Sequence, residues 1–406
     1  MFSRLSSILK IPICDNCLGR QFGKLLTGFD NKERGKILRN YAAFAIDHGS
    51  LDPNDIDLIN FKNISFRERK LEKPKEKFSC SVCNDFFEDG IEKYVKKALK
   101  KIKKLEFKTF AVGSRPSKEM LKKEEELWNI GGITTVEPIK SEINREVGKR
   151  LEKELGKKAE LKRPDVVLLL NFDRDEVLVS INSLYIYGLY QKIKRGIPQT
   201  KWPSGKYKKS VEQEVAKPLM KLTKGAGHKF HGKGREDIDV LCLGWRPFVI
   251  EITEPQKRKI DLKKLQKDVN KSKYVNVKKL KFSSMNEVRD LKAHTGDKTY
   301  NAIVKLDKPI EKKDLKKLKK LVGVINQRTP QRVAHRRADL IRKRKVKTLK
   351  TKFIDKKTFE MKVKTNAGTY IKELISGDDG RSKPSVAEIL DRKAICKQLD
   401  VIKIEV

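Results

Sequence analysis

The stretch Gly234-Arg-Glu-Asp-Ile-Asp239 places Asp237 beside an arginine and further carboxylates, directly after the glycine-rich run Gly225–Gly234. Alternating residues follow from Val240 to Leu243, which predicts that Asp237 lies where a loop enters a strand. A carboxylate held at such a position can act as a nucleophile. The same residues are also typical of a salt-bridged turn, so a catalytic and a purely structural interpretation both stay open.

The balance of charge indicates the kind of partner. The chain has 406 residues, with 95 Lys and Arg against 54 Asp and Glu, and its formal net charge is +41. Such a charge attracts phosphate groups over long distances, so it predicts a nucleic-acid partner. The alternative is a generally basic surface, because the lysine-rich runs at 97–104 and 312–320 are also typical of exposed helix faces.

The length allows about two or three domains, each with enough chain for its own core. No apolar run approaches the roughly 20 residues that span a bilayer. Residues 1–10 also lack the pattern of a secretion signal. We therefore expect a cytoplasmic protein that does not enter a membrane.

Four of the six cysteines form two Cys-x-x-Cys pairs, Cys14 with Cys17 and Cys80 with Cys83. In a reducing compartment such pairs are metal ligands first, and two of them can close a tetrahedral site of four thiolates. We therefore predict one structural Zn²⁺ that joins the two cysteine pairs, with a helical insertion around residues 32–48 between them. Binding of this ion is expected to be coupled to folding. A thioredoxin-like redox pair is the alternative, but neither pair lies in a βαβ pattern.

The first domain boundary is expected just after the second cysteine pair, which gives an N-terminal zinc segment over residues 1–83. A helix over 91–105, a strand over 107–113, a helix from Ser141 and a hairpin of strands over 165–170 and 177–181 predict an α+β domain. With Leu184-Tyr-Ile-Tyr-Gly-Leu-Tyr190 at its end, the region 84–190 resembles a THUMP domain, which many tRNA-modifying enzymes use to hold the acceptor end of tRNA. Because THUMP domains are usually fused to a catalytic domain, the resemblance implies that an enzyme follows.

Cofactor-binding motifs are missing from that following part. The glycine clusters at 225–227 and 232–234 do not follow an apolar strand, as a methyltransferase turn would require. A phosphate-binding loop needs Gly-Lys followed by Ser or Thr, whereas here Gly234 follows Lys233. We therefore expect no nucleotide cofactor.

From Asp237 onward the chain is similar to a pseudouridine synthase, with an aspartate in a Gly-Arg-x-Asp-like loop followed by a Lys-x-Tyr strand. The resemblance rests on these further segments: Arg195-Gly-Ile-Pro-Gln-Thr-Lys-Trp-Pro203, Ser210-Val-Glu-Gln-Glu214, Lys298-Thr-Tyr-Asn-Ala-Ile-Val304, Asn326-Gln-Arg-Thr-Pro-Gln-Arg-Val-Ala-His-Arg-Arg-Ala-Asp-Leu340, Asn366-Ala-Gly-Thr-Tyr-Ile-Lys-Glu-Leu374 and Gly377-Asp-Asp-Gly-Arg-Ser-Lys-Pro384. Together with the cysteine pairs and the THUMP-like region, they resemble the archaeal tRNA pseudouridine synthases of the Pus-ten family. The resemblance implies an α+β catalytic domain over 191–406, with a mixed or antiparallel sheet and a positively charged cleft.

The resemblance also implies an isomerase that needs no cofactor for catalysis. Asp237 is expected to be the nucleophile, attacking either the ribose or the uracil ring. Tyr300 is expected to stack on the extruded uracil and to take part in removing the C5 proton. Lys372 is expected to pair with Asp237 and keep its carboxylate ionised.

Further residues are expected to bind the substrate. Ile371 and Leu399 would form an apolar wall against the uracil, and Arg235 would contact phosphate or brace the extruded nucleotide. The arginine-rich block 328–344, which includes Arg332 and Arg336, suits bidentate phosphate contacts.

The implied substrate is tRNA, at uridines 54 and 55 of the T-loop, with the choice between one position and both left open. The leading alternative is a non-catalytic tRNA-binding or folding protein on a synthase scaffold. A THUMP-bearing enzyme of another chemistry is disfavoured by the missing cofactor motifs. One departure from the family pattern is that Leu241 and Cys242 stand where arginine and methionine usually follow, which leaves one RNA contact and the local turn geometry open.

Overall fold

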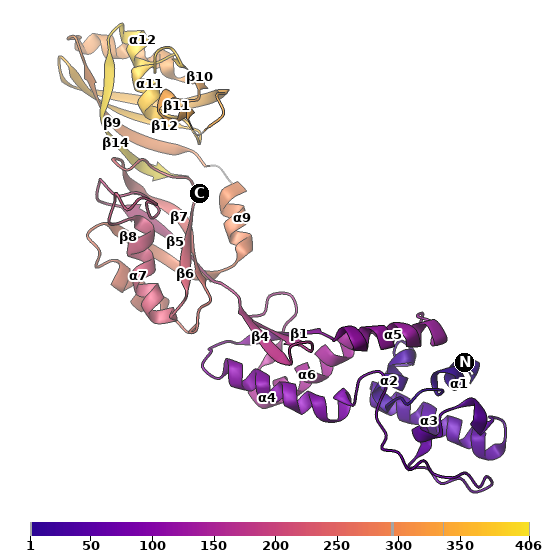
Figure 1. Cartoon of the computed structure of the whole chain (residues 1–406). Coiled ribbons are helices and arrows are strands. Elements are labelled where there is room, and N and C mark those ends of the chain that lie inside the picture. Colours follow the sequence, from indigo (N-terminus) through magenta and orange to yellow (C-terminus); the bar gives the residue numbers. More distant parts are fainter. Residues whose placement is uncertain (1, 294–295, 336, 406) are drawn as a thin grey trace. The chain divides into compact units, whose positions relative to one another are not determined.

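The computed structural model describes residues 2–293, 296–335 and 337–405 (Figure 1). The chain divides into two compact units, Met1–Asn182 and Ser183–Val406. Each unit has hydrophobic core residues of its own. Both units combine helices with a sheet, so the expected α+β class is confirmed. Among the described residues, no helix is long and apolar enough to cross a membrane.

The first unit begins with helices around the cysteine pairs. These helical elements are α1 (Phe2–Ile8), α2 (Asp15–Gly19), η1 (Arg20–Phe22), α3 (Asn31–His48), η2 (Pro53–Asp55), η3 (Leu58–Phe61) and η4 (Phe86–Gly90). The helical insertion expected around 32–48 is α3. It begins at Asp30, which forms a capping box with Glu33, and it ends at Gly49, whose φ of 88° suits a left-handed cap.

The rest of the first unit is a small sheet covered by helices. Its elements are α4 (Ile91–Ile102), β1 (Thr109–Arg115), α5 (Lys118–Gly131), α6 (Ile139–Leu155), β2 (Lys158–Ala159), β3 (Val166–Asn171) and β4 (Glu176–Ile181), with strand order β2-β1-β3-β4. β1 runs parallel to β3, and β3 and β4 form the expected antiparallel hairpin. α6 packs on β1 through Ile143, Val147 and Leu151, which recur at helical spacing on its buried face.

The second unit is built on a long mixed sheet. Its strands are β5 (Leu184–Lys192), β6 (Gly227–Gly232), β7 (Leu241–Thr253), β8 (Val275–Ser283), β9 (Lys298–Leu306), β10 (Gly323–Arg328), β11 (Ile341–Asp355), β12 (Thr358–Thr365), β13 (Ser382–Lys383) and β14 (Ala394–Ile404). Within the described residues, these ten strands follow the order β13-β10-β11-β12-β9-β14-β7-β5-β8, and β6 pairs with β7. β14 pairs antiparallel with β9 and parallel with β7, so it joins the two halves of the sheet.

Strand β5 corrects one sequence-based expectation. Its residues were expected to close the THUMP-like region that ends at residue 190. In the structure β5 instead lies between β7 and β8 of the second unit. The last strand of the first unit is β4, which ends at Ile181.

Helices cover both halves of this sheet. They are α7 (Val211–Thr223), α8 (Leu262–Val269), α9 (Met285–Ala293), η5 (Lys312–Leu321), α10 (Gln331–Ala334), α11 (Ile371–Ser376) and α12 (Val386–Leu390). α7 and α8 pack on each other and on β8, whereas α11 packs on α12 and β14. α11 therefore lies beside the strand that joins the two halves, which is where the candidate site is found (Figure 1).

Candidate active site

An open pocket of about 920 Å³ lies in the second unit. Its wall comes from the loop between β6 and β7, from the start of β9, from α10 and α11, and from β14. Of the eight residues expected in catalysis or substrate binding, these seven line it: Arg235, Asp237, Tyr300, Arg332, Ile371, Lys372 and Leu399. The eighth, Arg336, lies outside the described residues. The pocket thus brings together residues that are up to 164 positions apart, from Arg235 to Leu399.

Asp237 lies between two cationic side chains in this pocket. Its Oδ2 atom is 3.3 Å from Arg332 Nη1 and 3.4 Å from Lys372 Nζ. About 40% of the aspartate side chain is exposed, so a substrate can reach the carboxylate. The carboxylate therefore lies within ion-pair distance of two cations and is also open to the pocket.

Lys372 is shared between two carboxylates. Its Nζ atom is 2.8 Å from Asp239 Oδ2, closer than to Asp237. Burial lowers the pKa of Lys372, but the hydrogen bond to Asp239 and the charges of both aspartates outweigh burial, and the pKa lies above its usual value. The lysine therefore stays protonated as a donor beside Asp237.

Tyr300 is a buried phenol in the pocket wall. It lies on β9 opposite Val401 of β14, and only 9% of the residue is exposed. Burial raises the pKa of Tyr300 to about 12, with the Asp237 charge also raising it and the Arg246 charge opposing. The phenol is therefore neutral at physiological pH.

The loop that carries Asp237 is held from beneath by a buried lysine that the sequence analysis did not single out. Lys192 at the end of β5 is fully buried. Its ammonium donates hydrogen bonds to three carbonyl oxygens: Ile197 at 3.1 Å, Asp237 at 2.9 Å and Ile238 at 3.2 Å. The alternating burial of β5 puts Lys192 on the same face as Tyr190, so a lysine on a buried face was the available signal.

A buried ion pair supports the neighbouring residues of the same loop. Glu236 Oε2 accepts a hydrogen bond from the Tyr190 hydroxyl at 3.0 Å and pairs with Arg246 Nε at 3.2 Å. The Gln199 amide donates to the Gly234 carbonyl at 2.9 Å. The side chain before Asp237 is therefore directed into the protein, while the Asp237 carboxylate remains accessible.

Arg195 ties the loop to β14. Its guanidinium donates to the carbonyl of Asp239 at 2.7 Å and to the carbonyl of Leu399 at 3.0 Å, and it pairs with Asp400. Two segments that line the pocket are therefore connected by one side chain. Arg195 belongs to a segment that the sequence analysis quoted without giving this residue a role.

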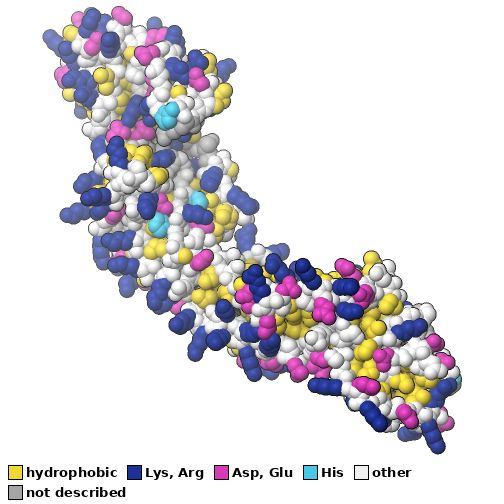
Figure 2. All heavy atoms as spheres, viewed as in Figure 1, with side chains coloured by type: hydrophobic (Ala, Val, Ile, Leu, Met, Phe, Trp, Pro, Cys, Tyr) yellow, Lys and Arg dark blue, Asp and Glu magenta, His cyan; other side chains and the backbone are white. Residues whose placement is uncertain are grey.

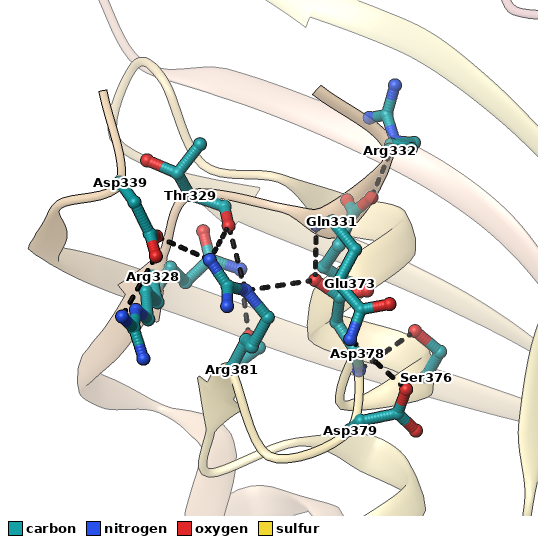
Figure 3. Close-up of polar contacts among 12 residues, drawn as sticks. Arg328, Thr329, Gln331, Arg332, Asp339, Glu373, Ser376, Asp378, Asp379 and Arg381 are labelled. Atoms are coloured by element: carbon teal, nitrogen blue, oxygen red, sulfur yellow. Dashed lines mark hydrogen bonds and ion pairs between the residues drawn. The ribbon is translucent and has the colours of Figure 1, made fainter. Parts of the chain in front are cut away.

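The Arg332 side chain beside Asp237 is positioned by contacts between α10, which carries it, and α11. Arg332 Nε donates to Glu373 Oε1 at 2.6 Å, which directs the rest of its guanidinium toward the pocket. α10 itself begins at Gln331, whose backbone N–H donates to Asp378 Oδ2 at 3.1 Å (Figure 3). The turn after α11 therefore anchors the short helix that carries Arg332.

That turn is conformationally unusual and is completed by Arg381. The residues Gly377, Asp378, Asp379 and Gly380 all have positive φ, between 45° and 84°. Figure 3 shows the Arg381 guanidinium directed at the segment before and after α10. It donates to the Thr329 carbonyl at 2.9 and 2.7 Å and pairs with Asp339, so it holds both ends of that segment.

Further arginines line the pocket near the same segment. Arg337 donates to the Tyr370 hydroxyl at 2.7 Å, Arg342 to Thr329 Oγ1 at 3.0 Å, and Arg344 to the Gly368 carbonyl at 3.2 Å. His335, in the same segment, is exposed. Lys and Arg side chains are spread over the visible face of the second unit (Figure 2).

The first unit contains a candidate metal centre. The four thiol sulfurs of Cys14, Cys17, Cys80 and Cys83 lie within 4.8 Å of one another, and all four residues are buried. The sulfurs of Cys14 and Cys83 are 3.6 Å apart, near the separation of about 3.8 Å that tetrahedral Zn–S bonds require. Burial raises the pKa of the Cys17 thiol, so a bound cation would be needed to hold this residue as a thiolate. The donor set therefore fits one metal ion.

Comparison with known proteins gives two family-model matches. Residues 185–405 match the model described as "Pus10, C-terminal", and residues 94–171 match "Pus10 THUMP domain, archaeal". The resemblance predicted from the sequence is thereby confirmed for both regions.

Curated proteins are similar over the whole length. A "tRNA pseudouridine synthase Pus10" of Methanothrix thermoacetophila is 37% identical over 100% of this chain and 94% of its own length. The proteins of the same name from Methanocaldococcus jannaschii and Pyrococcus furiosus are 41% and 39% identical, each over 97% of this chain and over 92% and 94% of their own lengths. A chain of a solved "Cbf5-Nop10-Gar1 Complex" is 19% identical over 53% of this chain and 48% of its own, with a TM-score of 0.33.

Proposed function

We propose that this chain, which belongs to the Pus10 family of tRNA pseudouridine synthases, converts uridine to pseudouridine in the T-loop of tRNA. Membership of this family makes the protein an isomerase. The target is position 54, position 55 or both. The THUMP domain and the family together imply an RNA substrate. No nucleotide cofactor takes part in this reaction, which is an isomerisation.

The position of Asp237 carries the proposal. Its carboxylate is accessible in the pocket and lies within 3.4 Å of both Arg332 and Lys372. The two cations pair with the carboxylate and fix its direction, which suits a nucleophile. Lys192 holds the backbone of the same residue, so the nucleophile is positioned before the substrate arrives.

The reaction requires the target uridine to leave the RNA stack and enter the pocket. Asp237 attacks the ribose or the uracil ring, and the bond between ribose C1′ and uracil N1 breaks. The base turns, a bond forms between C1′ and C5, and the transient bond to Asp237 breaks, which restores the carboxylate. The C5 proton is removed while N1 gains a proton. No electrons are gained or lost, so no redox cofactor takes part.

The other pocket residues are assigned by the same proposal. Tyr300 contacts the uracil ring and takes part in the transfer of the C5 proton. Ile371 and Leu399 are buried side chains at the pocket wall and exclude water from the base. Arg235 and the arginines of the 328–344 block, including Arg336, bind backbone phosphates.

We further propose that the metal ion of the four-cysteine site is zinc and that its role is structural. The site lies among the core residues of the first unit. A filled shell of four thiolates leaves no open position for a substrate, as in structural zinc sites. The family and the basic surface are consistent with a cytoplasmic protein.

Release of tritium from a tRNA transcript labelled at uridine C5 tests the proposal. Asp237→Asn is expected to abolish release and to leave tRNA affinity nearly unchanged, since phosphate contacts carry most of the binding energy. Asp239→Asn is the matched control, because the Asp239 carboxylate also pairs with Lys372. This variant is expected to retain turnover.

Two outcomes would contradict the proposal. Turnover by the Asp237→Asn protein would remove this residue from the role of nucleophile. If the unaltered protein binds the transcript but releases no tritium, the alternative of a non-catalytic tRNA-binding protein on a synthase scaffold is favoured.

A further inference from the structure

Two cationic side chains, of Lys298 and Arg246, meet beside Gly234, and a third cationic residue, Lys233, precedes it in the chain. The mechanism does not use this part of the pocket. Lys233 and Gly234 belong to the loop after β6, Arg246 lies on β7, and Lys298 begins β9. All four residues line the pocket. A side chain at position 234 would place its Cβ 2.9 Å from Lys298 Nζ and 3.2 Å from Arg246 Nη1. Glycine therefore leaves space beside both cations.

The positive charge of this cluster is not balanced. Glu236 is the carboxylate that pairs with Arg246, at 3.2 Å, and it also lies 4.0 Å from Lys192. Among the described residues, no carboxylate forms an ion pair with Lys233 or Lys298. Lys233 is buried and Lys298 is partly buried, so water screens their charges only weakly. Such a cluster is stabilised by an anion.

The protonation of Lys298 reflects this imbalance. Burial lowers the pKa of Lys298 to about 8, and the charges of Arg246 and Lys233 lower it as well. Two groups oppose the shift, Cys242 on β7 and Glu236 in the loop after β6. Lys298 is therefore mostly protonated at pH 7 and mostly neutral at pH 9, whereas an anion bound beside it would raise its pKa again.

The cluster lies close to the proposed reaction centre. Lys298 precedes Tyr300 by two positions on β9, so the two side chains leave the same face of the strand. Lys233 and Gly234 lie in the same loop as Asp237, four and three positions before it. An anion bound here would therefore be close to the nucleotide that is held by Tyr300 and Asp237.

We propose that Lys298, together with Lys233 and Arg246, forms a subsite for one backbone phosphate of the RNA, next to the extruded uridine. The identity of the ligand rests on the proposed function, because RNA is the anion which that function brings to the pocket. A uracil carbonyl is neutral and does not offset the excess charge, whereas a phosphate carries one negative charge per nucleotide. Lys298 thereby becomes a substrate-binding residue of the reaction.

Binding of an unmodified tRNA transcript by the full-length protein tests the subsite. Lys298→Met is expected to weaken affinity roughly tenfold at low salt. It should also reduce the slope of log affinity against log salt by about 0.7 to 1, the value for one lost phosphate contact. Lys305→Met is the matched control, because Lys305 is exposed on the same strand outside the pocket, and its salt slope should equal that of the unaltered protein.

The pH dependence separates a charge contact from a packing role. Affinity of the unaltered protein should fall as pH rises from 7 to 9, since free Lys298 loses its proton near pH 8. Lys298→Arg keeps its charge throughout this range, so its affinity should stay high at pH 7 and show a smaller fall toward pH 9. If the side chain at position 298 only fills space, the unaltered and Lys298→Arg proteins should show the same dependence of affinity on pH.

The outcomes can be told apart from a failure of the proposed function. Weaker binding by Lys298→Met with an unchanged salt slope would overturn the phosphate subsite, and so would equal pH profiles of the unaltered and Lys298→Arg proteins. If the unaltered protein releases no tritium but the predicted changes in salt slope and pH profile are found, the isomerase proposal fails while the subsite stands.

Discussion

At the scale of single residues, the backbone around Asp237 is held by side chains from other segments of the chain. Lys192 donates to the Asp237 and Ile238 carbonyls, and Arg195 donates to the Asp239 carbonyl. These bonds fix the backbone on both sides of Asp237, the proposed nucleophile, while Arg332 and Lys372 pair with its carboxylate. A catalytic group held in this way loses little entropy when the reaction begins.

Lys192→Met tests this support. The change removes the ammonium donor from three carbonyls, of which those of Asp237 and Ile238 still accept from the backbone N–H groups of Val240 and Gly196. An unsatisfied buried carbonyl costs about 1–3 kcal/mol. We expect a lower free energy of unfolding and a single-turnover rate reduced by on the order of a hundredfold. Affinity for tRNA should change less than about threefold, because phosphate contacts elsewhere are intact. Lys194→Met, an exposed neighbour, should behave as the unaltered protein, and an unchanged rate in Lys192→Met would contradict the positioning role.

Motifs in the sequence were sufficient to predict that Asp237, Tyr300, Lys372 and Leu399 belong to one site, and the structure places them around one pocket. They were not sufficient for Lys192 or Arg195. Both act through backbone carbonyls, of residues up to 204 positions away, and a carbonyl has no signature in the sequence. The cysteine pairs were easier to interpret, because thiol spacing itself indicates a metal site.

At the scale of elements, the turn Gly377–Arg381, which follows α11 in the chain, holds α10 through side-chain contacts. Arg381 holds the Thr329 carbonyl and Asp339, and Asp378 accepts from the Gln331 N–H (Figure 3). α10 is a single turn of helix and has little stability of its own. The direction of Arg332 toward Asp237 therefore depends on this turn.

A double-mutant cycle between Arg381→Met and Arg332→Met tests the dependence. Each change is expected to lower the single-turnover rate of isomerisation by on the order of ten- to a hundredfold. Because Arg381 acts through Arg332, the double variant should be little slower than Arg332→Met alone. Fully additive effects on the activation free energy would show that the two arginines act independently.

The periodicity of apolar residues predicted that most helices and strands exist, but it did not predict which strands pair with one another. Helical spacing of apolar residues predicted α4 and α6, and strand alternation predicted β3 and β4, all with slightly different ends. β5 was expected in the first α+β region because alternation shows that a strand exists but not what it pairs with. Its partners, β7 and β8, begin at Leu241 and Val275, and only tertiary structure identifies such distant pairing.

At the scale of the whole molecule, the four cysteines connect segments of the first unit that are far apart in the sequence. Metal analysis of the full-length protein should give one zinc per chain. Cys80→Ser is expected to lose the metal and to destabilise the first unit, because binding energy of a structural zinc site is folding energy. Cys396→Ser is the control, since this thiol lies outside the cluster. A metal-free protein with unchanged thermal unfolding would refute the site.

The two units should divide the work between affinity and chemistry. Their core residues do not overlap, running from Leu5 to Val177 in the first unit and from Leu184 to Ile404 in the second. A deletion must therefore end at Asn182, because a cut after Tyr190 would remove most of β5 from the sheet of the second unit. The proposed active site is intact in residues 183–406.

Removal of residues 1–182 is expected to weaken tRNA binding and to slow isomerisation far more at low substrate than at saturation. A domain that binds RNA away from the reacting base, as proposed for the first unit, contributes affinity, whereas the pocket of the second unit performs the chemistry. The fragment should also show a shallower slope of log affinity against log salt, because it retains only part of the phosphate contacts. Filter binding at several salt concentrations and a single-turnover assay measure both quantities. A fragment that matched the intact protein in affinity and salt slope would show that the first unit, despite its THUMP domain, takes no part in holding the tRNA.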